Sequence, residues 1–80
     1  MPKLRTFSGR DIIKIFKEFD FSIMGQKGSH VKLGRVVDGK HRQTLTIPNH
    51  KETDKGTVKA IYRQALRYIP EDELKSRFYK

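Results

Sequence analysis

The stretch "FSIMGQKGSHVKLGRVVDGKHRQTLTI", residues 21–47, decides the fold, because apolar and polar residues alternate through three short runs within it. The first run, residues 21–26, is typical of a half-buried strand. The second covers residues 29–37 and the third covers residues 42–47. A period of two residues marks a strand with one face against a core. The stretch therefore predicts three strands of one sheet.

Glycine marks both turns that would join these strands. Lys27 and Gly28 form the first turn. Asp38-Gly39 is a strong two-residue hairpin signal, because both positions of such a turn take a positive φ. Short turns join antiparallel neighbours, so the sheet is predicted to be antiparallel. Pro48 ends the third strand.

A helix is predicted before the strands. It begins at Ser8, whose hydroxyl can cap the backbone while Asp11 returns the interaction, and it ends near Asp20. The basic residues that precede it are expected to fray. Apolar positions at helical spacing form one stripe: Ile12, Ile13, Phe16 and Phe19. Three basic positions lie outside this stripe, toward solvent: Arg10, Lys14 and Lys17.

A second helix follows the strands and opens at residues 56–57, with Thr53 or Asp54 as its cap. Its apolar stripe has six members: Val58, Ile61, Tyr62, Ala65, Leu66 and Ile69. A basic band recurs every four residues: Lys55, Lys59, Arg63 and Arg67. This band is either a solvated helix face or a contact surface for phosphate or an acidic partner. Tyr62 and Tyr68 either stack on bases or pack at the edge of the stripe. Pro70 ends this helix or begins a short last one.

These elements predict one α+β domain over residues 1–80, in the order helix, three strands, helix. A three-stranded antiparallel sheet covered on one face by the two helices would bury every apolar stripe and leave the other face open. If Val31 and Leu33 point into the core, His30 and Lys32 point to that open face.

Charge narrows the class of function. Eighteen Lys and Arg residues stand against nine Asp and Glu residues, a formal net charge of +9. A domain this basic favours a polyanion, most often nucleic acid. The basic residues are spread over several elements, which argues against a membrane surface. The chain has no cysteine and no long apolar run, so we expect a cytoplasmic protein.

Histidine is the candidate catalytic group. The three histidines lack metal-ligand spacing, so we expect no metal or other cofactor. RNA supplies a reaction that needs little more than an imidazole: its 2′-hydroxyl attacks the neighbouring phosphorus while a histidine takes or gives a proton. His30, near Lys27 and Lys32, suits this role, or it is only a polar residue on a strand. His41 is expected to be solvent-exposed, and His50 is either a substrate contact or a plain loop residue.

Three motifs resemble one family. The Q-x-G-S-H turn at residues 26–30, the P-x-H loop at residues 48–50 and the helix start G-T-V-x-x-I-x-R-Q-A at residues 56–65 occur in the order found in HicA toxins, also called YcfA-like proteins. These belong to bacterial and archaeal toxin–antitoxin systems. The resemblance covers roughly residues 8–67.

The resemblance implies a fold like that of a double-stranded-RNA-binding domain. It also implies an mRNA interferase that arrests translation, with His30 as the catalytic residue, and a HicB-like antitoxin that masks this histidine. The tail, residues 70–80, extends beyond the resemblance. It would pack on the sheet edge, or contact the antitoxin or ribosomal RNA.

Three hypotheses remain. In the first, the chain is a toxin endoribonuclease: His30 is the acid or base, Lys27 and Lys32 hold phosphate, Gly28 lets the backbone turn toward the substrate, and Ser29 orients His30 or bonds a phosphate oxygen. In the second, the chain is an RNA-binding module without catalysis. In the third, it binds only an acidic protein partner.

Overall fold

The computed structural model describes residues 3–79. Six elements follow one another along the chain: α1 (Gly9–Lys17), β1 (Ser22–Lys27), β2 (His30–Val37), β3 (His41–Pro48), α2 (Lys55–Ala65) and α3 (Glu71–Phe78). The predicted order of a helix, three strands and a helix is confirmed. The alternative at Pro70 is also settled, because this residue precedes a third helix.

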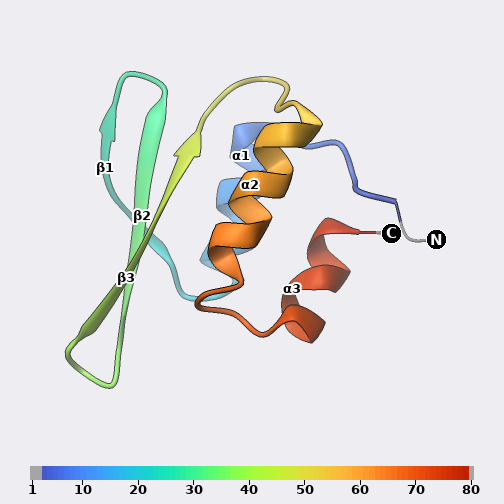
Figure 1. The fold of residues 1–80 in the computed structure, drawn as a ribbon. Coiled ribbons are helices and arrows are strands. Elements are labelled where there is room, and N and C mark those ends of the chain that lie inside the picture. The colour runs from blue at the N-terminus through green and yellow to red at the C-terminus, as the bar shows by residue number, and fades with distance from the viewer. Residues whose placement is uncertain (1–2, 80) are drawn as a thin grey trace.

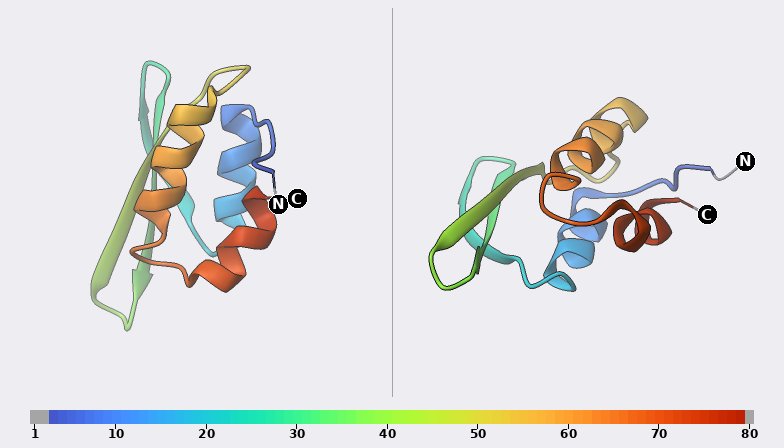
Figure 2. Two further views of the ribbon diagram at one scale, coloured as in Figure 1. Left: turned by 45° about the vertical axis from the view of Figure 1, so that its right-hand side comes forward. Right: turned by 60° about the horizontal axis from the view of Figure 1, so that its bottom comes forward.

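The elements form layers (Figure 1). The sheet has the order β1-β2-β3, and both of its pairings are antiparallel. Helices α1 and α2 cover one face of the sheet, and the opposite face is open (Figure 2). Helix α3 packs on the side of α1 and α2 that faces away from the sheet, so the tail lies far from both sheet edges.

The register of β2 against β3 fixes which side chains face the helices. Val31 pairs with Ile47 and Leu33 pairs with Leu45, and all four side chains are buried. Because successive strand residues point to opposite faces, the residues between them face solvent. His30 is exposed on this outer face, as the alternation predicted.

The prediction that the first strand, residues 21–26, is half-buried is confirmed only at Phe21, which is buried just before β1 begins. All six residues of β1 are exposed, and the side chains of Ile23 and Met24 are each 50% accessible. Both helices contact β3, which leaves β1 at the uncovered margin of the sheet. The pairing of β1 with β2 also shifts register between Ile23 and Gly25. An edge position and a bulge therefore override the alternation.

The two turns follow the positive-φ rule. Asp38 and Gly39 have φ of 56° and 72°, which confirms the hairpin and its positive-φ residues, but Val37 pairs with His41, so the loop contains three residues and not two. The first turn lies one residue later than predicted: Lys27 already pairs with His30, so Gly28 and Ser29 form the loop. Gly28 has φ of 60°, which a residue without a Cβ atom adopts at no steric cost.

Side-chain caps begin the first two helices. The Ser8 hydroxyl accepts from the Asp11 backbone N–H, and the Asp11 carboxylate accepts from the Ser8 N–H, each at 3.0 Å. Asp54, one of the two predicted caps of α2, accepts from the backbone N–H of Thr57 at 3.1 Å and from its hydroxyl at 2.7 Å. Helix α1 ends at Lys17, earlier than predicted.

The prediction that the segment before α1 frays is wrong for residues 3–8, and residues 1–2 lie outside the described part of the chain. Leu4 forms a β-bridge with Tyr79, and Phe7 forms another with Thr53. Phe7 is also buried in the core. Backbone pairing and burial thus hold this segment between the end of α3 and the loop before α2.

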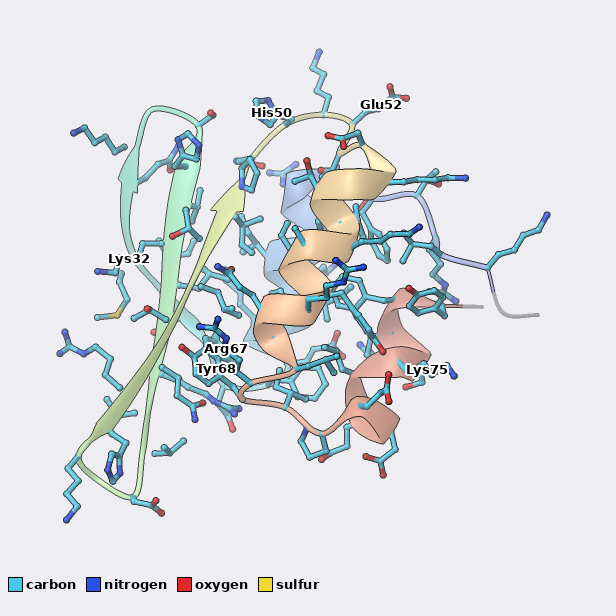
Figure 3. The ribbon with its side chains drawn as sticks, in the orientation of Figure 1. Lys32, His50, Glu52, Arg67, Tyr68 and Lys75 are labelled. Atoms are coloured by element: carbon cyan, nitrogen blue, oxygen red, sulfur yellow. The ribbon has the colours of Figure 1, made fainter. Side chains whose placement is uncertain are left out.

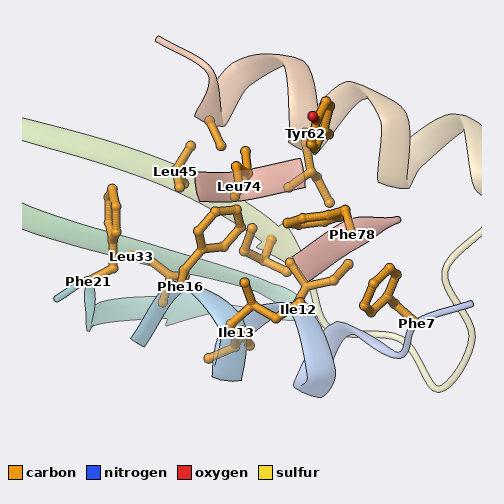
Figure 4. Packing of buried hydrophobic residues seen from close by; sticks show 14 of the residues in the cluster. Phe7, Ile12, Ile13, Phe16, Phe21, Leu33, Leu45, Tyr62, Leu74 and Phe78 are labelled. Atoms are coloured by element: carbon orange, nitrogen blue, oxygen red, sulfur yellow. The ribbon is translucent and has the colours of Figure 1, made fainter. Parts of the chain in front are cut away.

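Aromatic side chains join the helices behind the sheet (Figure 4). Phe78 of α3 is fully buried, and its ring centroid lies 5.2 Å from that of Phe7, 5.9 Å from that of Phe16 and 5.4 Å from that of Tyr62. Such tilted and edge-to-face pairs add to the free energy gained from burial alone. Phe78 therefore connects α3 to α1, α2 and the N-terminal segment at once.

Arg35 of β2 connects the sheet to the segments that follow α1 and α2. Its guanidinium donates to the carbonyl oxygen of Phe19 at 2.7 Å, to that of Tyr68 at 2.9 Å and to the side-chain oxygen of Gln43 at 2.7 Å. It also lies 4.7 Å from the centroid of the Phe21 ring. The planar fork of arginine can serve several acceptors together. One side chain thereby ties the ends of both sheet-covering helices to the sheet.

Phe78→Ala is expected to lower the free energy of unfolding by about 3–5 kcal/mol, because it removes a large buried side chain and leaves a cavity. Urea unfolding followed by circular dichroism measures this change. Lys75→Ala, an exposed change on the same helix, is the control and should stay within about 0.5 kcal/mol. Equal effects of the two changes would contradict the central place of Phe78.

Stability should fall in acid. Hydrogen bonds from the Thr57 hydroxyl and backbone N–H lower the pKa of Asp54, and the bond from the Ser8 backbone N–H lowers the pKa of Asp11. A carboxyl whose pKa is lower in the folded state stabilises that state above its unfolded pKa, and this contribution is lost as pH falls through the folded value. Asp54→Asn keeps a capping oxygen. The amide does not ionise, and it accepts with one oxygen where Asp54 uses two, so the variant should be less stable than the wild type near pH 7 and should lose less stability than the wild type below about pH 5. A steeper acid loss in the variant would contradict this prediction.

Candidate functional site

Two loops meet at one end of the sheet. The turn between β1 and β2 ends at His30, which pairs with Lys27 on one side and with Pro48 on the other. Beyond Pro48 the chain enters the loop to α2, where the backbone N–H of Asn49 donates to the carbonyl oxygen of Ser29 at 2.6 Å. The residue before His30 is therefore held by the loop that follows β3.

The first turn of α1 fixes this loop from the helix side. The backbone N–H of Gly9 donates to the carbonyl oxygen of His50 at 2.8 Å. A Cβ atom at position 9 would lie 2.5 Å from the Cα atom of Asn49 and 2.6 Å from the carbonyl oxygen of Pro48. Only glycine fits so close to another backbone segment. The helix and the loop thus approach each other at a distance that no other residue allows.

The three histidines separate into two groups. His30 is exposed on the open face of the sheet, and His50 is exposed on the loop at the same end of the molecule (Figure 3). His41 lies at the opposite end of the sheet, where it starts β3 beside the Asp38-Gly39 turn. Its imidazole is exposed, as predicted, and lies 3.9 Å from the Asp38 carboxylate. His41 is therefore remote from the other two.

Basic side chains surround His30. Lys27 is its direct partner across the two strands. Lys32 lies two residues further along β2, on the same face, and Figure 3 shows its side chain pointing away from the helices. Both lysines are exposed. The sequence-predicted residues 27–32 thus lie together at one hairpin end, where His30 shares its face of the sheet with two lysines.

Gly28 and Ser29 make up the turn itself. The Gln26 side-chain amide donates to the carbonyl oxygen of Gly28 at 3.0 Å, and this hydrogen bond links the end of β1 to the turn. A Cβ atom at Gly28 would meet no atom within 4 Å, so its positive φ and not a close neighbour explains the glycine. The outer side of the turn is open to a ligand.

The basic band that α2 begins (Lys55, Lys59, Arg63 and Arg67) is exposed along its whole length, although α2 ends at Ala65 and Arg67 lies beyond it. The two tyrosines that were alternatives for base stacking instead pack in the protein. Tyr62 is buried against Phe78 and Tyr79, and burial, with Glu71 nearby, raises its pKa. Tyr68 is partly buried and packs on Phe21.

Two further features bear on the class of site. Within residues 3–79, no three His, Asp or Glu side chains gather where they could hold a metal ion. No helix in this part of the chain has the length and apolar character needed to cross a membrane.

Comparison with known families identifies the chain. A family model described as the HicA toxin of bacterial toxin–antitoxin systems matches residues 9–66. The chain belongs to the HicA toxin family. It is thus a toxin of the toxin–antitoxin type, and the family implies an antitoxin partner. In the comparisons with curated proteins and with solved structures, nothing matches this HicA-family chain.

The matched region contains the candidate site and the segments that contact it, from the first turn of α1 to the end of α2. It starts at Gly9, contains the turn before His30 and the loop of His50, and ends one residue after α2. Helix α3 lies outside it, although Phe78 fills the centre of the helical core. The sequence also gave no sign of the Gly9 contact, because a close approach between distant segments leaves no local pattern.

Gly9→Ala should destabilise this toxin, although the same change at a free helix position stabilises by about 0.5–1 kcal/mol. The new Cβ atom forces the Pro48–Asn49 backbone to move, and overpacking of this kind costs about 1–3 kcal/mol. Urea unfolding measures the sign and the size of the change. Gly25→Ala is the matched control, because a Cβ atom there would meet nothing within 4 Å. A stabilising effect of Gly9→Ala would contradict the packing described here.

Proposed function

We propose that this HicA-family toxin is an endoribonuclease that cleaves mRNA without a metal or other cofactor, with His30 as its general acid or base. The observation that carries the proposal is the exposure of His30 on the open sheet face, with Lys27 beside it and Lys32 on the same face. Family membership supports the toxin role, and the net charge of +9 supports a polyanionic substrate.

The reaction needs only proton transfer and charge stabilisation. The 2′-oxygen of a ribose attacks the adjacent phosphorus, and the bond from phosphorus to the 5′-oxygen breaks. The 2′-hydroxyl loses its proton and the departing 5′-oxygen gains one, which leaves a 2′,3′-cyclic phosphate and a 5′-hydroxyl. An imidazole can accept the first proton or donate the second, since histidine exchanges protons near neutral pH.

The residues next to His30 would bind the phosphate and stabilise its charge. The ammonium groups of Lys27 and Lys32 stabilise the negative charge that builds on the phosphate oxygens during attack. Ser29 orients His30 or donates its hydroxyl to a phosphate oxygen, and its position is held because Asn49 bonds its carbonyl oxygen. Gly28 turns the backbone without adding a side chain that would keep the substrate away.

The same chemistry explains selectivity and control. DNA lacks the 2′-hydroxyl, so a site of this kind would cleave RNA and spare DNA. A histidine on an open surface needs no opening motion to meet a substrate. A HicB-like antitoxin that covers the outer sheet face would therefore block cleavage in the cytoplasm by occupying the surface around His30.

The second candidate function is an RNA-binding module without catalysis. It has the same fold, the same net charge and the same open surface, and it would hold RNA through phosphate contacts. The two candidates differ only in the chemistry of the imidazole.

His30→Ala is expected to reduce cleavage of single-stranded RNA by about 10²–10⁴-fold, the usual contribution of a general acid or base. RNA affinity should change little, because a neutral ring supplies a small part of the binding of a basic domain. Analysis of product ends should find 2′,3′-cyclic phosphate with the wild type. His41→Ala, an equal change at the far end of the sheet, is the control and should cleave normally. RNA left intact by wild-type protein over a broad pH range would favour the second candidate.

A further inference from the structure

The two flanks of helix α1 differ in charge: one is mixed and the other is basic only, with Lys14 lining both. On the flank toward α3, a cavity of about 660 Å³ is lined by both signs of charge, including Asp11 and Glu18. Glu18 forms an ion pair there with Arg77. On the flank toward β1, a groove of about 540 Å³ is lined by Arg10, Lys14 and Lys17 (the α1–β1 groove). The helix thus turns a basic edge toward the uncovered margin of the sheet.

The α1–β1 groove also has an apolar wall. Ile13 of α1 and Ile23 of β1 line it together with the three basic residues and Asn49. Ile23 is 50% exposed, so about half of its side chain faces the groove or solvent. Among the described residues that line the groove, every charged one is basic. A cationic rim beside an apolar wall suits a ligand with anionic groups on one side and flat apolar surfaces on the other.

The groove continues to the end of the sheet that carries His30. A second hollow of about 440 Å³ is lined by Ser8, Lys51 and His50, and it shares Arg10 and Asn49 with the α1–β1 groove. Asn49 is the residue whose backbone N–H bonds Ser29, next to His30. The two hollows therefore form one basic path that runs along α1 to the loop of His50; none of residues 27–32 lines it, and Asn49 is its link to the turn before His30.

We propose that the α1–β1 groove binds a single strand of RNA and leads it to His30. Phosphates lie along Arg10, Lys14 and Lys17, which span about 10 Å of the helix axis at 1.5 Å per residue. Unpaired bases rest on the half-exposed Ile23, with the buried Ile13 beside it, a contact that a duplex does not offer because its base faces are stacked inside the helix. This inference rests on the proposed function, and it names α1 and not the basic band of α2 as the principal phosphate contact.

The test uses His30→Ala protein, which binds RNA without cleaving it, and a fluorescent oligouridine as the probe. Arg10→Gln with Lys17→Gln removes two charges from the groove, and Lys59→Gln with Arg63→Gln removes two from α2 as the matched control. For single strands, each lost phosphate contact lowers the slope of log affinity against log salt by about 0.7. The groove pair should therefore lower the slope by about 1.4 and weaken binding by roughly tenfold or more at 0.1 M salt. The control pair should leave both nearly unchanged.

A second variant tests the apolar wall. Ile23→Ser alters a half-exposed side chain of an edge strand, so folding should survive. It should weaken binding of the oligouridine several-fold and leave binding of a short RNA duplex unchanged. Lys17→Gln alone, with an expected slope change of about 0.7, keeps the test valid if the double variant does not fold.

The outcomes separate the groove from the nuclease. Unchanged oligouridine affinity in the groove pair would overturn the inference, whether or not the wild type cleaves RNA. A groove pair that keeps its RNA affinity but loses antitoxin binding would also overturn it and would identify the groove as a protein-binding surface. If the groove pair loses affinity while wild-type protein fails to cleave, the nuclease proposal falls and the RNA groove stands.

Discussion

The approach of α1 to the loop after β3 sets the geometry of the functional end of the molecule. Gly9 lets the two backbones come closer than any Cβ atom would permit. At this distance the loop bonds the helix through His50 and the β1–β2 turn through Asn49. Backbone groups alone therefore position Ser29 and His30 relative to the helical layer. The candidate site is thus held by backbone contacts to the loop, and such pre-organisation would favour the proposed binding and proton transfer.

The rest of the domain is built so that this end stays free. Phe78 and Arg35 hold the layers together behind the sheet and at its far end. Arg35 directs its guanidinium to carbonyl oxygens inside the protein, so its hydrogen-bond donors are occupied and are not free to bind a ligand. The outer face of the sheet carries exposed basic and polar side chains together with the exposed apolar residues Met24 and Val36. The core and the proposed RNA contacts around His30 thus lie on different faces of the sheet.

The sequence predicted those features that local pattern controls. Alternation placed Val31 and Leu33 in the core and His30 outside it, and the caps at Ser8 and Asp54 began helices where expected. The alternation predicted that Ile23 is buried, but it is half exposed, because no helix covers this edge strand. Arg35, Phe78 and the α1–β1 groove depend on contacts between segments far apart in the chain. Neither residue spacing nor composition records such contacts, so only the folded structure brings them to light.

The register shift in β1 has a consequence for how copies of the protein meet. An exposed edge strand offers unpaired backbone groups to the edge of another molecule, and a long regular edge invites strand-to-strand polymerisation. Here the irregularity between Ile23 and Gly25 divides β1 into two short pieces, and Lys27 adds a charge to one of them. This irregular and charged edge is therefore a poor template for strand pairing with a second copy.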